Sequence, residues 1–90
     1  MRLKFYNAVG QIATTKIIVE SIILTDGTAA TLFTFYNEAT SAQTESAKKL
    51  YLKVPAAETI QIVGPFYFEA GLYMDMDNEG ANAGATIVTK

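Results

Sequence analysis

The chain has 90 residues, of which 50% are hydrophobic and 18% are charged, and its formal net charge is −2. This is the composition of a globular domain rather than a disordered segment, and the scattered lysines and arginines argue against a nucleic-acid-binding protein. The sequence has no cysteine and no histidine, which excludes disulfides, thiolate metal sites and the commonest proton shuttle.

No targeting or membrane-spanning segment is expected. The amino terminus lacks the apolar run of about 7–15 residues that a signal peptide requires. The longest apolar stretch, residues 17–24, contains Glu20 and Ser21 and is far shorter than the roughly 20 residues of a membrane span. We therefore expect a soluble product that is made in the cytoplasm and has no membrane partner.

The first strand is expected at residues 2–6, where Leu3 and Phe5 alternate with polar side chains. Residues 1–10 are also a candidate N-terminal arm, because this start is extended and partly basic. Residues 11–24 are dense in β-branched side chains, which favour strands. A helix over residues 16–24 is the alternative, and it is disfavoured because β-branched residues lose side-chain freedom in helices.

Asp26-Gly27 is the strongest hairpin signal, since these residues readily take the positive φ angles of a tight turn. The strands on either side of it are expected to pair antiparallel. Residues 29–36 carry aromatic rings on both alternating sides, so both faces of that strand are expected to be covered. Asn78, Glu79 and Gly80 form a second hairpin signal, after which residues 83–89 are expected to pair back.

Residues 37–46 are the longest polar stretch and are expected to form an exposed loop. A short helix over residues 42–49 is the alternative. The strand at residues 48–54 follows, with Leu50, Leu52 and Val54 on one side. Pro55 is expected to end it, because proline has no amide hydrogen to donate to a neighbouring strand.

A strand at residues 59–63 leads through Gly64-Pro65 into residues 64–77, which we expect to form the central pair of strands. This stretch has three consecutive aromatics and then a strict alternation of apolar and polar side chains, the pattern of a strand with one face in a core. The side chains predicted to be buried share this two-residue periodicity: Leu32, Leu50, Leu52, Ile60, Ile62, Leu72, Met74 and Met76.

Seven to eight short strands, with turn signals every 8–12 residues or so, predict an all-β fold. We expect one domain over residues 1–90, a small antiparallel β-sandwich or barrel that is jelly-roll-like. The hydrophobic share of 50% is high for so small a domain. Part of the apolar surface is therefore expected to be buried between copies of the chain.

The only clustered acids are Asp75, Asp77 and Glu79. On a strand, Asp75 and Asp77 would lie about 7 Å apart on one face, which suits a hard cation. A calcium ion takes six to eight oxygen ligands, however, and charges on an exposed strand or in a turn have ordinary structural reasons. We therefore predict no catalytic residue, no cofactor and no metal site, and a cation at these three acids remains the alternative.

Aromatic side chains are the candidates for a binding surface. Tyr73 beside Asp75 is the one suggestion of a sugar-binding platform, whereas exposed tyrosines more often mark protein interfaces. The predicted interface residues are the aromatics on strands where both sides are apolar: Phe33, Phe35, Tyr36, Phe66, Tyr67, Phe68 and Tyr73.

Three segments carry a resemblance to a known class of proteins, and they span the chain from about Thr15 onward. The first is residues 24–29 with Leu32, Phe33 and Tyr36-Asn37; the second is Leu50, Leu52 and residues 54–59; the third is residues 66–73. Together they resemble the small all-β virion proteins of tailed bacteriophages, such as head-decoration proteins and other accessory structural components.

This resemblance implies a structural virion component: a capsid decoration protein, a head or tail accessory protein, or a subunit associated with a fibre or spike. It implies synthesis in the host cytoplasm and residence in the virion. The expected partners are the chain itself, with a trimer favoured, and a larger capsid or tail protein. Neither enzymatic activity nor a small-molecule substrate is expected. The alternative function is that of a small carbohydrate-binding β module.

Overall fold

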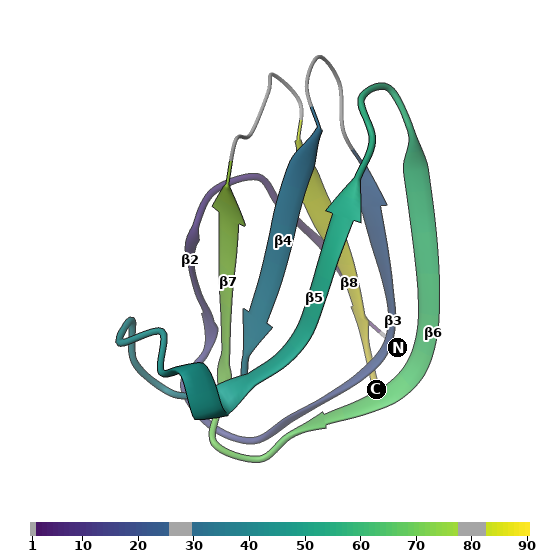
Figure 1. Cartoon of the computed structure of the whole chain (residues 1–90). Helices are drawn as coiled ribbons and strands as arrows, with labels where there is room; N and C mark the ends of the chain where they lie inside the picture. Colours follow the sequence, from purple (N-terminus) through teal and green to yellow (C-terminus); the bar gives the residue numbers. More distant parts are fainter. Residues whose placement is uncertain (1, 26–29, 78–82) are drawn as a thin grey trace.

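The computed structural model describes residues 2–25, 30–77 and 83–90, which form two layers of strands (Figure 1). The elements in chain order are β1 (Arg2–Tyr6), β2 (Gly10–Ala13), β3 (Ile17–Thr25), β4 (Thr31–Tyr36), the 3-10 helix η1 (Glu45–Ala47), β5 (Lys48–Val54), β6 (Thr59–Phe68), β7 (Leu72–Asp77) and β8 (Gly84–Thr89). Within the described ranges, no helix has the length and apolarity that crossing a bilayer would demand.

The strands form two four-stranded antiparallel sheets. Sheet A has the order β1-β8-β3-β6 and sheet B the order β2-β7-β4-β5. The chain is thus folded like one long hairpin, with β4 and β5 nearest its tip and β1 and β8 at its open end. This hairpin is rolled up so that β3 also pairs with β8 and β4 with β7. The result is the strand order of an eight-stranded jelly roll, which confirms the predicted all-β sandwich.

The core lies between the two sheets, because each inner strand turns one of its alternating faces inward. Phe33 and Phe35 on β4 are fully buried, with parallel rings whose centres are 6.5 Å apart. They meet Leu72 and Met74 from the neighbouring strand β7 and side chains such as Ile22 from sheet A. Burial of aromatic and branched side chains on this scale is the main term stabilising the fold.

The predicted core is confirmed in large part. Leu72, Met74 and Met76 are buried, and four further predicted members lie half-buried against the core, namely Leu50, Leu52, Ile60 and Ile62. The prediction is wrong for Leu32. Its partners across the sheet are Lys53 and Asp77, so it lies on the outer face of sheet B.

Both predicted hairpins are wrong. The turn residues 26–29 and 78–82 lie outside the described residues, but the strands flanking them do not pair with each other. Strand β3 pairs with β6 and β8, whereas β4 pairs with β5 and β7. Neither strand has a free edge for the other, and the chain instead passes from one sheet to the opposite sheet at both places.

The predicted central pair is also corrected. Residues 59–68 form one strand, β6, which runs through Gly64-Pro65 and lies at the edge of sheet A, whereas β7 is an inner strand of sheet B. The strand-favouring residues 11–24 lie largely in β2 and β3, and the alternative helix over residues 16–24 does not form. In residues 42–49 the only helix is η1, which covers Glu45–Ala47, and strand β5 begins at Lys48.

The candidate arm is a strand. Residues 2–6 form β1, which pairs with β8 along its whole length, from Arg2 opposite Thr89 to Tyr6 opposite Ala85. The two chain ends therefore lie side by side, as the marks N and C in Figure 1 show.

Polar side chains hold the exposed loop between β4 and β5 against the sandwich. The backbone N–H of Asn37 donates a hydrogen bond to the backbone carbonyl of Ala47 at 2.7 Å. The backbone N–H of Ala70 donates to the side-chain oxygen of Asn37 at 2.9 Å. The side-chain nitrogen of Gln11 lies 2.7 Å from the Ala13 carbonyl and 2.9 Å from the Glu38 carbonyl. These contacts tie the base of the loop to β2 and to the start of β7.

Candidate interaction surface

The outer face of sheet A is the candidate site, because apolar side chains reach it from all four strands. On β3, Val19, Ile22 and Leu24 are buried in the core, so the residues between them point outward. We call the following set the apolar face: Leu3, Phe5, Ile18, Ile23, Val63, Tyr67 and Val88. Their side chains come from β1, β3, β6 and β8.

The strand register brings these residues into rows across the sheet. Leu3 lies opposite Val88, which lies opposite Ser21, which in turn lies opposite Val63. A second row runs from Phe5 through Thr86 and Ile23 to Gln61. Residues directly opposite each other on an antiparallel pair have neighbouring side chains. The apolar side chains of the face are therefore near neighbours, with the polar residues Ser21, Thr86 and Gln61 between them.

Much of this face is accessible to solvent. The exposed fraction is 74% for Val63, 64% for Leu3, 50% for Phe5 and 47% for Tyr67, and these are four of the six exposed large hydrophobic side chains among the described residues. Single exposed hydrophobic residues are common on soluble proteins, whereas a contiguous apolar patch generally marks an interaction site.

The outer face of sheet B is different, because several charged side chains lie on it. Lys53 and Asp77 lie on either side of Leu32, and Tyr51 and Asp75 on either side of Thr34. Burial raises the pKa of Asp75 above its ordinary value, with a smaller contribution from the negative charge of Asp77. Among the residues that the structure describes, charged side chains are therefore fewer on the outer face of sheet A than on that of sheet B.

Strand β1 is oriented opposite to the usual rule for an edge strand. Its basic residue Lys4 lies opposite Ile87, a core residue, and so starts from the inner side of sheet A, although its side chain is exposed at the sheet edge, whereas Leu3 and Phe5 face outward. Gly84 fixes this arrangement in part, since a Cβ at this position would lie 2.5 Å from the Phe5 ring. The outward ring of Phe5 thus packs over a glycine on β8.

A hollow interrupts the apolar face where the ladder between β3 and β6 is irregular. Val19 lies opposite Phe66 and Ser21 opposite Val63, so Glu20 faces the two residues Gly64 and Pro65. Irregularities of this kind locally disrupt a ladder and bend the strand, and Figure 1 shows β3 and β6 curving together. The hollow has a volume of about 510 Å³, and its lining includes Glu20, Gln61, Tyr67 and Lys90.

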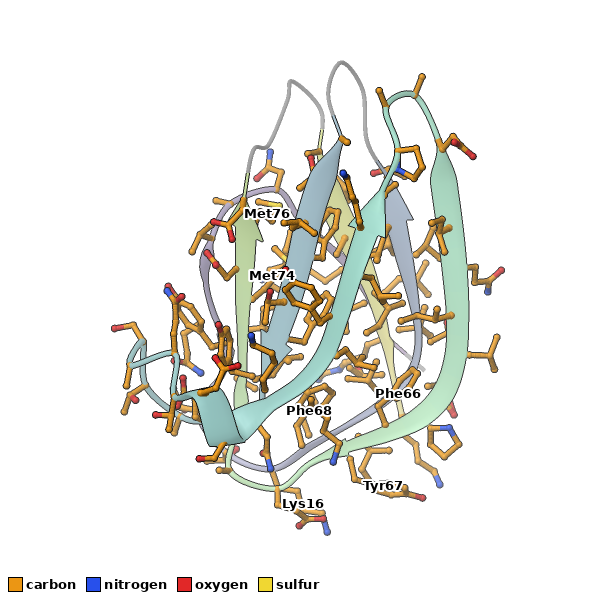
Figure 2. All side chains as sticks on the ribbon, viewed as in Figure 1. Lys16, Phe66, Tyr67, Phe68, Met74 and Met76 are labelled. Atoms are coloured by element: carbon orange, nitrogen blue, oxygen red, sulfur yellow. The ribbon has the colours of Figure 1, made fainter. Side chains whose placement is uncertain are left out.

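The predicted interface residues fall on two sides of β6 and in the core. Phe66 and Phe68 point between the sheets, whereas Tyr67 points away from them (Figure 2). The other predicted residues, Phe33, Phe35, Tyr36 and Tyr73, are at most 7% exposed. Of the seven, only Tyr67 has an exposed side chain.

Sequence reasoning missed the rest of the apolar face. Leu3, Phe5 and Val63 each stand in an alternating strand pattern that a core residue would share. The pattern shows which residues lie on the same side of the strand, but it does not show whether that side faces the core or the solvent. The inverted orientation of β1 is the feature that the sequence pattern did not predict.

Of the three acids considered as a cation site, the structure describes two, Asp75 and Asp77, and it places no third acid beside them among the described residues. Asp75 and Asp77 lie on the outer face of sheet B, and Glu79 falls outside the described residues. Within those residues no group of three or more acids, cysteines or histidines is placed to hold a metal ion. The sugar-binding platform at Tyr73 is not supported, because this ring is only 7% exposed.

Comparisons with protein-family models, with curated proteins and with solved structures found no match for this chain.

Proposed function

We propose that this chain is a structural subunit of a bacteriophage particle, which works by binding copies of itself and a larger capsid or tail protein. The observation that supports this most directly is the apolar face, a solvent-accessible group of neighbouring apolar side chains beside which the described residues place one acid, Glu20, and one base, Lys90. Such a surface is typical of assembling proteins, because water makes its exposure unfavourable.

The jelly roll is compatible with this role, since viral capsid proteins use the same architecture. Lectins and cupins also use it, so the fold by itself does not select one function. The resemblance of residues 24–37, 50–59 and 66–73 to accessory phage proteins is the reason for preferring a virion component over other assemblies. On this proposal the chain is made in the host cytoplasm and resides in the virion.

The test is to purify the phage particles whose genome encodes this chain and to measure the chain by quantitative mass spectrometry relative to the major coat protein. We expect a fixed ratio of many copies per particle, which remains after nuclease treatment and repeated density-gradient centrifugation. A host cytoplasmic protein of similar abundance serves as the contamination control. Loss of the chain in parallel with that control would contradict the proposal.

Carbohydrate binding is a second candidate, favoured by the content of the hollow. Tyr67 offers an exposed ring beside the carboxylate of Glu20 and the amide of Gln61, and aromatic rings with nearby polar groups suit sugar rings. Glycan-array binding that is lost in a Tyr67→Ala variant and kept in a Tyr51→Ala variant would support this candidate. Tyr51 is the matched control because it is 57% exposed on the opposite sheet.

A further inference from the structure

We propose that the outer face of sheet A binds the same face of a second copy of this chain, in a two-fold face-to-face pair. This inference rests on the proposed assembly role and names the surface that performs it. The orientation of β1 and the charges, shape and area of the face favour a second copy over another occupant.

The orientation of β1 indicates that its outward side is covered in the working protein. Leu3 and Phe5 point outward while Lys4 faces the other way. Lys4 is exposed in this orientation, so hydration of its charge does not select the orientation, whereas the reverse orientation of the strand would bury more apolar surface in a protein that stays monomeric. The observed orientation is favourable when a partner buries Leu3 and Phe5.

The charges on the face are self-complementary. Glu20 and Lys90 are the charged residues that line the hollow, and neither side chain forms an ion pair with any residue that the structure describes. In a two-fold pair, the axis lies in the interface, and an axis passing between these two side chains places Glu20 of one copy against Lys90 of the other. One acid and one base satisfy the requirement of a contact between identical surfaces.

This charge balance argues against other occupants. A nucleic acid or an anionic membrane would require an excess of lysine and arginine on the face. A strongly charged protein partner would require a face whose charged side chains all have the opposite sign. The apolar face offers neither. A second copy requires only that the surface be complementary to itself. The acid Glu20, the base Lys90 and the seven apolar side chains of the face meet this requirement.

The hollow gives the face the relief that close packing requires. Two sheets pack face to face by interdigitating their side chains at a spacing of about 10 Å. Val63, which is 74% exposed, projects beside the hollow of about 510 Å³. A projecting side chain of one copy therefore has a depression to enter on the other.

The area suffices for a stable pair. Strands spaced about 4.8 Å apart and roughly 17–33 Å long make a face of roughly 500 Å² in projection. Two such faces in contact remove roughly 1,000 Å² or more from water, since side-chain relief adds accessible area, and a specific interface needs about this much. Taken alone, this face favours a two-fold pair, and the trimer expected from the sequence would need a further contact.

The test is sedimentation equilibrium of the full chain over a micromolar concentration series. We expect a species of twice the 9.8 kDa chain mass. A Val63→Asp variant is expected to raise the dissociation constant by about 100-fold or more, because each pair would bury two unpaired carboxylates. The matched control, Tyr51→Asp, adds the same charge at an exposed position of the opposite sheet and is expected to leave the mass unchanged.

A charge exchange tests the two-fold geometry without an apolar position. Glu20→Lys and Lys90→Glu are each expected to weaken the pair by about tenfold, and the double variant is expected to recover it. Circular dichroism and thermal melting confirm that every variant is folded. A monomeric wild type, or a Val63→Asp variant that associates as strongly as the wild type, would overturn the inference.

The two proposals fail separately. A monomeric chain that is nonetheless present in fixed ratio on particles overturns the pair and keeps the virion role. A chain that pairs as expected but is absent from particles keeps the pair and overturns the virion role. A monomeric chain that binds glycans through Tyr67 and is absent from particles overturns both.

Discussion

Leu32 and Leu72 show how a residue's partners across the sheet decide its burial. Both stand in alternating strand patterns, and both were expected in the core. Leu72 is fully buried, whereas Leu32 lies between Lys53 and Asp77 on the outer face of sheet B. The pattern alone treats them alike, and only the pairing of β4 with β5 and β7 separates them.

A pair of alanine variants measures this difference. Leu72→Ala is expected to lower the free energy of unfolding by about 2–5 kcal/mol, since it removes a buried side chain and leaves a cavity. Leu32→Ala is expected to lower it by about 1 kcal/mol or less, because the half-buried side chain loses less contact with the protein. Urea denaturation of both variants gives the two values, and equal losses would contradict the assignment of faces.

The partly buried carboxyl group of Asp75 predicts a pH dependence. Burial raises its pKa in the folded protein above the value of 3.8 for a free side chain. The folded state therefore binds this proton more tightly than the unfolded state. The contribution of Asp75 to stability is greatest below pH 3.8 and declines as the pH rises from 3.8 through the raised pKa.

An Asp75→Asn variant removes this titration. We expect it to raise the urea midpoint relative to the wild type at neutral pH, and we expect the gain to shrink below pH 3.8. Glu58→Gln, at an exposed turn position, is the control for the loss of one negative charge. A lower midpoint for Asp75→Asn at neutral pH would mean that the carboxylate stabilises the fold, contrary to this account.

At the scale of strands, the sequence predicted local structure well and pairing poorly. Strand β5 has the predicted bounds, and Pro55 follows it directly. The two hairpin signals failed because a turn-forming pair such as Asp26-Gly27 favours a reversal of the chain without deciding which strands pair. Which strands pair depends on which arrangement of the two sheets buries the most apolar surface. In this chain that arrangement joins strands that are distant in sequence, such as β3 with β8.

The same limit explains the candidate site. Alternation in β1 groups Leu3 with Phe5, but it does not say whether that side faces the core or the solvent. The three successive aromatics of β6 divide between the core and the surface, with Tyr67 outward and Phe66 and Phe68 inward. Which side faces outward becomes known only from the register with β3 and β8.

At the scale of the whole molecule, the topology sets how the chain must fold. Of the four strand pairs that make up the rolled hairpin, only β4 with β5 joins consecutive strands, and β1 with β8 joins the two ends of the chain. Each non-local pair requires the closure of a long loop before its contacts stabilise anything. Folding rates fall as the mean sequence separation of contacts increases.

We therefore expect slow refolding for so small a protein, with the main phase in the range of about milliseconds to seconds. Stopped-flow refolding followed by tyrosine fluorescence measures it, since the chain has five tyrosines and no tryptophan. The Val63→Asp variant is the appropriate chain, because self-association would otherwise add a concentration-dependent step. A main phase in the microsecond range would contradict this expectation. It would mean that the non-local strand pairs do not limit the folding rate.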